Sequence, residues 1–346
     1  MKIRKKLIAW YLMHKRPLPW RETQDPYKIW LSEIMLQQTR VEQGMPYYFK
    51  FLEAFPSVHD LANATEGEVL KLWQGLGYYS RARNLHETAK HVSKSLNGQF
   101  PRTYKELIKL KGVGDYTASA IASICFNEAT PVVDGNVYRV LSRYYGIRTP
   151  INSTSGIKEF KALAEELIDK ERPATFNQAI MEFGAIQCKP QNPYCLHCPL
   201  NDSCMALATS KVKELPIKLK KGKIKRRFFN YLVMISDDDE TQLQQRTKKG
   251  IWQHLYEFPL IEAEKKLSKK ELLELQGFKD LVKDNNFKVS LYNDEEVIHK
   301  LSHQHLHTQF WIVLVNEIKK GAIPISNIKK YPVPILIDNF VEEFNF

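Results

Sequence analysis

The sequence has no apolar run of the length that a membrane-spanning helix needs, about 18 residues or more. Its first residues also lack the extended apolar core and small-residue cleavage site of a secretory signal. A soluble, cytoplasmic protein with no membrane partner is therefore expected. Acidic residues are scarcer than basic ones, 39 against 51, which gives a formal net charge of +12. This imbalance favours a polyanionic partner, because Lys and Arg that neutralise phosphates release bound counterions.

Cysteine is also scarce, with five residues in the chain, yet four of them crowd into Cys188-x6-Cys195-x2-Cys198-x5-Cys204. Without a secretion signal, clustered thiols are more typical of metal binding than of disulfides. The spacing does not form two CxxC pairs, which argues against a zinc ribbon. One compact loop with four thiolates instead suits a [4Fe–4S] cluster. The fifth thiol, Cys125, lies in a small apolar helical run and is expected to be an ordinary buried cysteine.

At 346 residues the chain is long enough for two domains with separate cores. Hydrophobic periodicity predicts an all-α unit over residues 1–207, a basic linker over 208–227 and an α+β domain over 228–346. Residues 211–227 hold nine Lys or Arg against one Glu, which is typical of a solvated linker that can also lie along a phosphate backbone. The predicted helices are 1–16, 26–41, 45–55, 57–64, 66–74, 80–96, 103–110, 117–124, 135–146, 154–170, 174–186, 268–283 and 335–344, and the predicted strands are 228–235, 252–261 and 310–318.

A tight hairpin between two helices is predicted at Gly112-Val113-Gly114. The two glycines separate an apolar helical run that ends at Leu110 from a small-residue run that begins at Thr117. Glycine has no Cβ, so the backbone N–H groups of such a hairpin and of the next helical turn can approach a phosphate closely. The pattern therefore indicates a helix-hairpin-helix element, which also occurs in proteins that only hold DNA.

Two carboxylates are candidates for chemistry on DNA. Asp134 stands just ahead of a helical pattern, where it is either a catalytic group or simply the N-cap of that helix. Glu33 lies on a largely apolar helix face together with Ile29 and Leu36. Burial there would raise its pKa and suit it to donating a proton near neutral pH, although most glutamates in such patterns are partly exposed or capped.

A glycine turn over residues 75–79 carries the paired tyrosines Tyr78 and Tyr79, followed by Arg81 and Arg83. Aromatic rings next to cations on a turn suit insertion between bases and contact with phosphates. Tyrosines packed in a core would give the same string.

The hairpin, Asp134 and the four-cysteine loop, in this order, resemble the DNA glycosylase superfamily that includes endonuclease III. More narrowly, WLSEIMLQQTRV, LWQGLGYYSRARNL, LKGVGDYTASAI, VVDGNVYRVL and FNQAIMEFGAIQC resemble adenine DNA glycosylases of the MutY type. The resemblance implies an all-α helix-hairpin-helix glycosylase domain with an iron–sulfur cluster loop, followed by an α+β Nudix-like domain. It also implies base excision repair of double-stranded DNA, by a monomer that is nucleoid-associated if the source is bacterial.

The activity that this family implies is removal of adenine mispaired with 8-oxoguanine or guanine. Glu33 would protonate the flipped adenine, ionised Asp134 would stabilise the sugar cation, and Tyr116 and Asn136 would position them. Tyr116 takes the place of the Schiff-base lysine of the related lyases, which implies a monofunctional enzyme. By resemblance, Trp20, Arg21, Leu36 and Glu182 line the adenine pocket, Gln38 and Tyr78 wedge into the duplex, and Gly112 and Gly114 lie against its backbone.

The C-terminal domain of the family recognises 8-oxoguanine through a Phe-Ser-His turn, which corresponds here to Leu301-Ser302-His303. Leu301 replaces the phenylalanine and with it the ring that would stack or wedge, so recognition is expected from Ser302 and His303. The glutamate-rich signature of true Nudix hydrolases is missing, because residues 269–276 offer only Glu271 and Glu274. Pyrophosphate hydrolysis is therefore not expected.

Two other functions are compatible with parts of the sequence. One is a bifunctional pyrimidine glycosylase and lyase like endonuclease III, which Tyr116 and the extra domain disfavour. The other is a DNA-binding module without catalysis, in which Glu33 and Asp134 would be only surface and capping residues.

Overall fold

The computed structural model describes residues 2–220, 222, 224–344 and 346. Its contacts divide the chain into two compact units, which are described separately. The helical unit holds residues 1–63 and 84–220, and the sheet unit holds residues 64–83 and 221–346. Two segments group differently from the predicted division: residues 64–83 belong with the C-terminal part of the chain, and residues 208–220 of the predicted linker belong with the helical unit.

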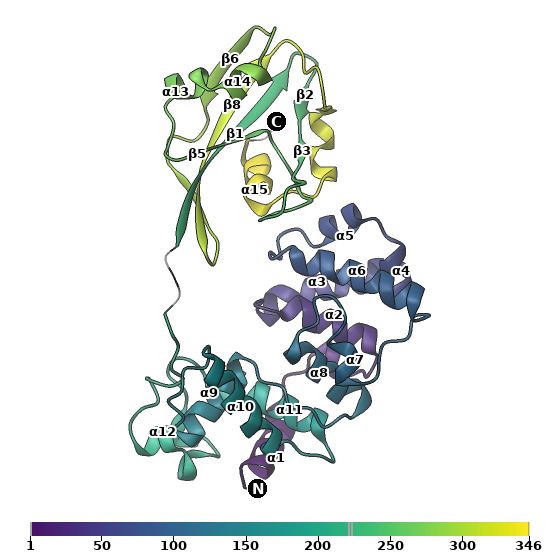
Figure 1. Ribbon diagram of the computed structural model, residues 1–346, viewed down its shortest axis with the longest axis vertical. Helices are drawn as coiled ribbons and strands as arrows, with labels where there is room; N and C mark the ends of the chain where they lie inside the picture. The colour runs from purple at the N-terminus through teal and green to yellow at the C-terminus, as the bar shows by residue number, and fades with distance from the viewer. Residues whose placement is uncertain (1, 221, 223, 345) are drawn as a thin grey trace. The chain divides into compact units, whose positions relative to one another are not determined.

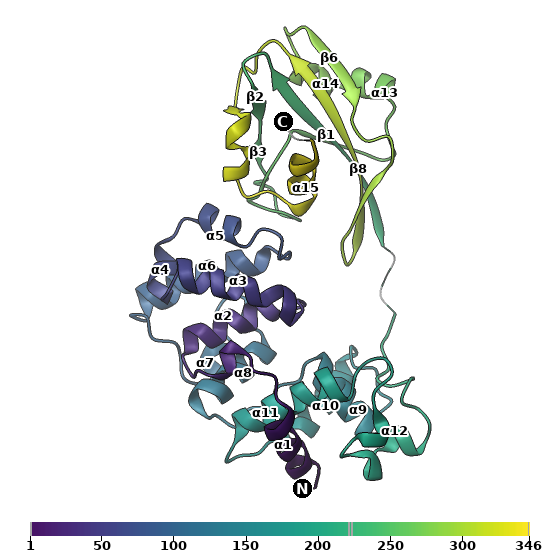
Figure 2. The same ribbon diagram turned by 180° about the vertical axis from the view of Figure 1, so that it is seen from behind.

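The helical unit contains the helices predicted for it, with their ends moved by a few residues. α1 lies beside α11, so the first helix of the unit packs on one of its last (Figures 1 and 2), and α2 packs on α8. The elements are α1 (Lys2–His14), η1 (Pro19–Arg21), α2 (Pro26–Leu36), α3 (Val41–Ala54), α4 (Val58–Asn63), α6 (Ser80–Ser95, which starts in the sheet unit), α7 (Tyr104–Leu107), α8 (Asp115–Phe126), α9 (Gly135–Tyr145), α10 (Thr154–Leu167), α11 (Pro173–Glu182), the π-helical turn η2 (Phe183–Gln187), η3 (Cys195–His197), η4 (Asn201–Ser203) and α12 (Met205–Ala208).

Local sequence explains where the helices that carry the site begin. The side chain of Asp25 caps α2 by accepting the Tyr27 N–H at 2.9 Å, and Pro26 occupies the first helical position. Gly114 is the N-cap of α8, and Asp134 is the N-cap of α9. Gly112, at φ +77°, leaves no room for a Cβ, which would lie 2.7 Å from the Cβ of Asn84. These positions therefore depend on the residue types that the sequence places there.

The sheet unit is built on two long parallel strands, β1 (Lys225–Ser236) and β8 (Gln304–Val315), paired along their whole length. β5 (Leu260–Ala263) pairs antiparallel with the other edge of β1, and both β6 (Phe287–Leu291) and β7 (Val297–Lys300) pair antiparallel with β8. The remaining elements are α5 (Glu66–Leu72), β2 (Glu240–Gln242), β3 (Gln244–Gln245), β4 (Tyr256–Glu257), α13 (Lys269–Glu274), α14 (Gln276–Leu281), β9 (Ala322–Pro324), η5 (Ile325–Lys330) and α15 (Ile335–Phe344).

Helices cover both faces of this sheet, as Figures 1 and 2 show. On one face, Leu232 and Trp311 pack in a buried cluster with Phe278 of α14. On the other face, Phe310 stacks on Phe340 of α15, with ring centroids 4.1 Å apart. Because both faces are covered, β1 and β8 are largely apolar on both sides.

Three segments differ from the sequence-based prediction for physical reasons. The strand predicted over 252–261 is replaced by two short strands, β4 and β5, which lie on either side of Phe258-Pro259 and pair with different partners. Its predicted start is lost because Trp252 and His254 adopt left-handed backbone angles, φ +57° and +67°. The helix predicted over 268–283 divides at Leu275, whose backbone is extended. The basic linker begins in a packed environment, since Leu215 is buried and its carbonyl accepts an N–H from Arg143 at 3.0 Å. The predicted helix over 335–344 coincides with α15.

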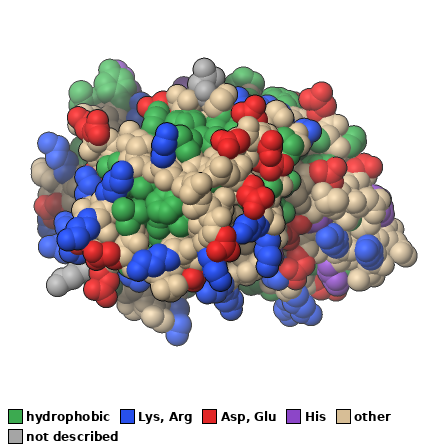
Figure 3. All heavy atoms as spheres, turned by 90° about the horizontal axis from the view of Figure 1, so that it is seen from above, with side chains coloured by type: hydrophobic (Ala, Val, Ile, Leu, Met, Phe, Trp, Pro, Cys, Tyr) green, Lys and Arg blue, Asp and Glu red, His purple; other side chains and the backbone are tan. Residues whose placement is uncertain are grey.

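Within the ranges that the structure describes, no helix has the length and apolar character needed to cross a membrane. On the face drawn in Figure 3, basic side chains are interspersed with acidic ones around an apolar area. The excess positive charge therefore does not form one uninterrupted patch on that face.

Candidate active site and cysteine pocket

A cavity of about 190 Å³ lies in the helical unit, where η1 and α2 meet α8, α9 and α11. It brings together eight of the residues that the sequence singled out, which come from widely separated segments. These are Trp20, Arg21, Glu33, Leu36, Tyr116, Asp134, Asn136 and Glu182. Arg16, Gln178 and Met181 line it as well, and nothing in the sequence pattern marked them.

Glu33 is 9% exposed and projects from α2 into this cavity beside Ile29 and Leu36. Burial raises the pKa of its carboxyl to about 7, assisted by the negative charge of Asp134 and opposed by a hydrogen bond from the Tyr116 hydroxyl. A carboxyl with this pKa is protonated in a substantial fraction of molecules near neutral pH. Glu33 can therefore donate a proton into the cavity under ordinary conditions.

Tyr116 stands at the second position of α8, directly after the glycine hairpin. Its hydroxyl contacts the Glu33 carboxyl and the Met181 sulfur, at 3.2 Å from the latter. Burial and the two neighbouring carboxyls raise the pKa of this phenol well above its ordinary value. It is therefore a neutral hydrogen-bond partner of Glu33, and a phenol cannot form a Schiff base.

Asp134 is the N-cap of α9 and also lines the cavity. Its Oδ1 accepts the N–H groups of Asn136 and Val137 at 2.9 and 2.8 Å, which caps α9, and its Oδ2 accepts the Asn136 side-chain N–H at 2.7 Å. Burial raises the pKa of Asp134 above its ordinary value, but these hydrogen bonds and the charge of Arg139 counteract that effect. The carboxyl thus faces the cavity while being held by donors that favour its ionised form.

Arg139 links this cap to the cysteine-containing segment. Its Nη2 donates to Asn136 Oδ1 at 2.9 Å and to the Gly184 carbonyl at 2.6 Å, and its Nε donates to the Cys188 carbonyl at 2.7 Å. The guanidinium is 8% exposed. A single buried side chain therefore orients Asn136 and fixes the start of the cysteine loop at the same time.

Glu182 also lines the cavity and is 1% exposed. Burial alone would raise its pKa, but hydrogen bonds from Arg16 and Arg21 outweigh it and lower the pKa to about 2. Both guanidinium groups reach the carboxylate at 2.8 Å. Glu182 therefore remains ionised, in contrast to Glu33 in the same cavity.

The predicted DNA-contacting residues lie outside the cavity lining. Gly112 and Gly114 form the hairpin ahead of α8, and Gln38 follows α2 with a left-handed backbone, φ +56°. Tyr78 belongs to the sheet unit, where its ring is 47% exposed. An exposed side chain on a turn is available for contact with a partner.

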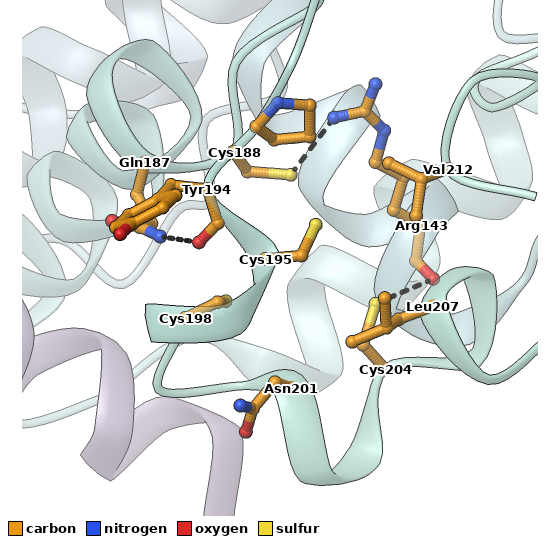
Figure 4. Close-up of a pocket in the computed structure, with 11 residues that line it drawn as sticks. Arg143, Gln187, Cys188, Tyr194, Cys195, Cys198, Asn201, Cys204, Leu207 and Val212 are labelled. Carbon is orange, nitrogen blue, oxygen red and sulfur yellow. Dashed lines mark hydrogen bonds between the residues drawn. The ribbon is translucent and has the colours of Figure 1, made fainter. Parts of the chain in front are cut away.

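The four cysteines of the loop line a single pocket between η2, α9 and α12. Figure 4 shows Cys188, Cys195, Cys198 and Cys204 around a common space. Arg143 donates from Nη1 to the Lys189 carbonyl at 2.7 Å and lies 3.5 Å from the Cys188 sulfur. In the part of the chain that the structure describes, no three His, Cys, Asp or Glu side chains converge closely enough to hold a single metal ion.

Ser302 and His303 lie in the tight turn between β7 and β8. The Leu301 N–H donates to the Gln304 carbonyl at 2.8 Å, which closes the turn, and the side chains of Ser302 and His303 are within hydrogen-bonding distance, at 3.2 Å. Both side chains are exposed. The hydroxyl and the imidazole therefore lie next to each other on the surface.

Comparison with known proteins agrees with this geometry. Residues 31–169 match the HhH-GPD superfamily of base excision DNA repair proteins, and residues 230–343 match the NUDIX domain. The adenine DNA glycosylase of Buchnera aphidicola subsp. Baizongia pistaciae is 36% identical over 314 residues, which cover 90% of this chain and 86% of that protein. The chain belongs to the adenine DNA glycosylase family.

Other relatives match a smaller share of the chain. The adenine DNA glycosylase of Homo sapiens is 47% identical over 209 residues, or 58% of this chain and 38% of that protein. A solved thermostable thymine-DNA glycosylase superposes with a TM-score of 0.56 at 31% identity, covering 60% of this chain and 95% of that one. Endonuclease III in a non-covalent complex with DNA gives a TM-score of 0.53 at 25% identity, covering 60% and 96%.

The close approach of η2 to α9 gives a testable consequence. A Cβ at Gly184 would lie 2.6 Å from the Cβ of Asn136 and 2.8 Å from its carbonyl oxygen. We expect Gly184→Ala to lower the free energy of unfolding by about 1–3 kcal/mol, because backbone atoms have to move to admit the methyl group. Urea denaturation of the full chain measures this loss.

Gly277→Ala is the matched control. Gly277 lies in α14, where a Cβ would meet nothing closer than 3.7 Å, so that substitution should be neutral or slightly stabilising. Equal denaturation midpoints for Gly184→Ala and the wild type would contradict the packing described for η2.

Proposed function

We propose that the protein is a monofunctional DNA glycosylase that excises adenine mispaired with 8-oxoguanine or guanine in base excision repair. The observation that carries the proposal is the pair of carboxyl groups, Glu33 and Asp134, which face one cavity in different electrostatic environments. Membership of the adenine DNA glycosylase family supports adenine as the base that is removed.

Glu33 is proposed to act as the general acid. Adenine is stacked within the duplex, so it has to be flipped into the cavity before any side chain can reach it. It leaves poorly as an anion, and protonation at N7 makes it a neutral leaving group. A pKa of about 7 gives Glu33 a proton to donate at physiological pH.

Asp134 is proposed to stabilise the positive charge that develops on the sugar as the base departs. A carboxylate next to an oxocarbenium-like centre stabilises it electrostatically, or traps it for a short time, before water attacks. Asn136 holds one of its oxygens, while Tyr116 contacts Glu33. Because Tyr116 offers no amine, the reaction is proposed to stop at the abasic site.

The remaining cavity residues are proposed to bind the flipped adenine. Trp20 and Leu36 offer apolar contact, whereas Arg21 and Glu182 form a charged wall. Outside the cavity, the hairpin glycines Gly112 and Gly114 are proposed to hold the DNA backbone. Gln38 and Tyr78 are proposed to wedge into the duplex.

The cysteine loop is proposed to hold a [4Fe–4S] cluster through Cys188, Cys195, Cys198 and Cys204. The fit rests on four thiols that line one pocket, with the Arg143 guanidinium beside the Cys188 sulfur. When bound, such a cluster ties the loop together covalently, and hydrolysis of a glycosidic bond requires no electron from it. Its proposed role is therefore structural.

The proposed functional domains have the bounds that the sequence predicts. Residues 1–207 form the catalytic domain, 208–227 the basic linker and 228–346 the lesion-recognition domain. Ser302 and His303 are proposed to contact 8-oxoguanine, whose oxidised edge differs from guanine by one carbonyl and one N7 proton. A hydroxyl beside an imidazole offers both a donor and an acceptor. The protein is proposed to act as a monomer on double-stranded DNA.

One duplex assay tests the proposed activity. A duplex with adenine opposite 8-oxoguanine should yield an abasic site, which alkali converts into a strand break. Breaks that form without alkali would indicate a lyase instead. Absence of breaks under either condition would indicate a DNA-binding module without catalysis. The rate is measured in a single turnover, with enzyme in excess.

The pH dependence of that rate tests the assignment of Glu33. The acid must be protonated, so the single-turnover rate should be high below a pKa of about 7 and fall as pH rises through it. Glu33→Gln should lower the rate by about 10² to 10⁴. Glu53→Gln, an exposed site on α3, should leave it unchanged. A rate of Glu33→Gln within a few-fold of wild type would contradict the assignment.

The metal content tests the cluster. Protein purified without oxygen should contain about four iron and four sulfide ions per chain. Cys198→Ser should reduce this content, whereas Cys125→Ser, in α8 and outside the pocket lining, should retain it. Stoichiometric zinc without iron or sulfide would contradict the cluster.

Lesion recognition is tested by Ser302→Ala combined with His303→Ala. Loss of one or two hydrogen bonds to the lesion should cost about 1–3 kcal/mol with adenine opposite 8-oxoguanine. Binding with adenine opposite guanine should change less. Ser290→Ala, exposed on β6, serves as the control. Affinities and single-turnover rates are measured on both duplexes. An unchanged ratio between the values for adenine opposite 8-oxoguanine and adenine opposite guanine would place recognition elsewhere in the protein.

A further inference from the structure

The turn that presents Tyr78 has an unusual backbone. Gly75, Gly77 and Tyr78 all have positive φ angles, +91°, +78° and +48°. A left-handed conformation is common for glycine but rare for a bulky residue such as tyrosine. Tyr78 is nevertheless 47% exposed, so burial of its own ring does not account for the conformation. Neighbouring groups must hold the turn in this shape.

Part of that support comes from within the turn itself. The Gly77 carbonyl accepts the Trp73 indole N–H at 3.0 Å and an Arg81 N–H at 3.2 Å. The Arg81 guanidinium also lies over the Tyr78 ring, 5.5 Å from its centroid. These contacts define the positions of Gly77 and Tyr78 relative to α5 and the start of α6.

Further support for the turn comes from residues 331–333, which precede α15 in the same unit. Lys71 Nζ donates to the Tyr331 carbonyl at 3.3 Å, and Gln74 Oε1 accepts the Val333 N–H at 3.1 Å. The Tyr79 hydroxyl accepts the Gly75 N–H at 3.3 Å and lies 3.5 Å from the Val333 carbonyl, to which it donates. Side chains before and after the turn therefore form hydrogen bonds with the Tyr331 carbonyl, the Val333 N–H and the Val333 carbonyl.

Two further contacts hold the segments on either side of the turn. The Glu66 carboxylate, in the first turn of α5, pairs with the imidazole of His254 at 2.5 Å. Arg83, in the first turn of α6, donates to the Gln253 carbonyl at 2.7 Å. The segment over 64–83 is thus bound at its beginning, middle and end by residues that lie more than 160 positions later in the chain.

We propose that Lys71, Gln74 and Tyr79 are positioning residues, through which the backbone of residues 331–333 holds the turn in the shape that presents Tyr78 to DNA. This inference rests on the proposed function, in which Tyr78 contacts the duplex. It assigns the C-terminal part of the chain a role that is separate from recognition of the lesion. That role applies equally to adenine opposite 8-oxoguanine and adenine opposite guanine, because the turn does not involve Ser302 or His303.

The test is a double-mutant cycle between Tyr79 and Tyr78. Affinity is measured on the full chain in the Glu33→Gln background, so that the duplex is not consumed. Tyr79→Phe removes only the hydroxyl and should weaken binding to both duplexes about three- to tenfold. Tyr78→Ala should weaken it by about tenfold or more. Added to Tyr78→Ala, Tyr79→Phe should have less than about a twofold further effect, because the ring that it positions is gone.

Lys71→Met and Gln74→Ala test the same inference at two other contacts with residues 331–333. The methionine keeps most of the side-chain length but removes the donor to Tyr331, and both variants should behave like Tyr79→Phe. Tyr27→Phe is the matched control, since its hydroxyl donates to the Phe55 carbonyl at 2.7 Å within the helical unit. It should lose comparable stability in urea without loss of affinity for DNA.

The inference is overturned if Tyr79→Phe binds DNA as tightly as the parent, or if it weakens binding by the same factor when Tyr78 is alanine. It is also overturned if Tyr78→Ala alone has no effect, and in that case adenine excision by the wild type remains intact. If the wild type does not excise adenine at all, both the proposed function and this inference are contradicted. The excision assay and the binding cycle therefore separate the two failures.

Discussion

Burial of ionisable groups around one small cavity is the constraint on which the rest of the helical unit depends. Glu33, Asp134 and Glu182 are all partly or fully shielded from water, which by itself favours the protonated form of each. The groups around each carboxyl then shift its pKa differently. Glu182 receives two guanidinium groups and stays ionised, whereas Glu33 receives one phenolic hydroxyl and has a pKa of about 7. A proton donor and a carboxylate that stays ionised therefore line the same cavity.

Burial also raises the pKa of Asp134, but the helix that its carboxyl caps counteracts this effect. The backbone donors at the start of α9 would be unsatisfied without it, and they stabilise its charge in return. Arg139 extends the arrangement from Asn136 to the Cys188 carbonyl, and Gly184 lets η2 approach closely enough for that contact. The position of the catalytic candidate is therefore coupled to the packing of the cysteine segment.

Much of the fold was predictable from short-range chemistry. Asp25-Pro26 marked the start of α2, and the glycines around Val113 marked the hairpin, because caps and glycine turns act over a few residues. The division of the predicted 268–283 helix at Leu275 and the break in the predicted 252–261 strand were missed. Those features depend on the backbone angles of Leu275, Trp252 and His254, which hydrophobic periodicity does not encode.

The sequence by itself determined the helix-hairpin-helix pattern, the four-cysteine loop and the carboxylates at positions 33 and 134, since each is marked by residue type and spacing. Only the tertiary structure decided that Arg16 binds Glu182, that Met181 contacts the Tyr116 hydroxyl, and that Arg139 joins Asn136 to the cysteine segment. It also decided that residues 331–333 contact the turn before Tyr78. Apart from the contact between Arg139 and Asn136, these partners are separated along the chain by tens to hundreds of positions. Long-range contacts of this kind follow from packing, and packing leaves no periodic signal in the residues on either side.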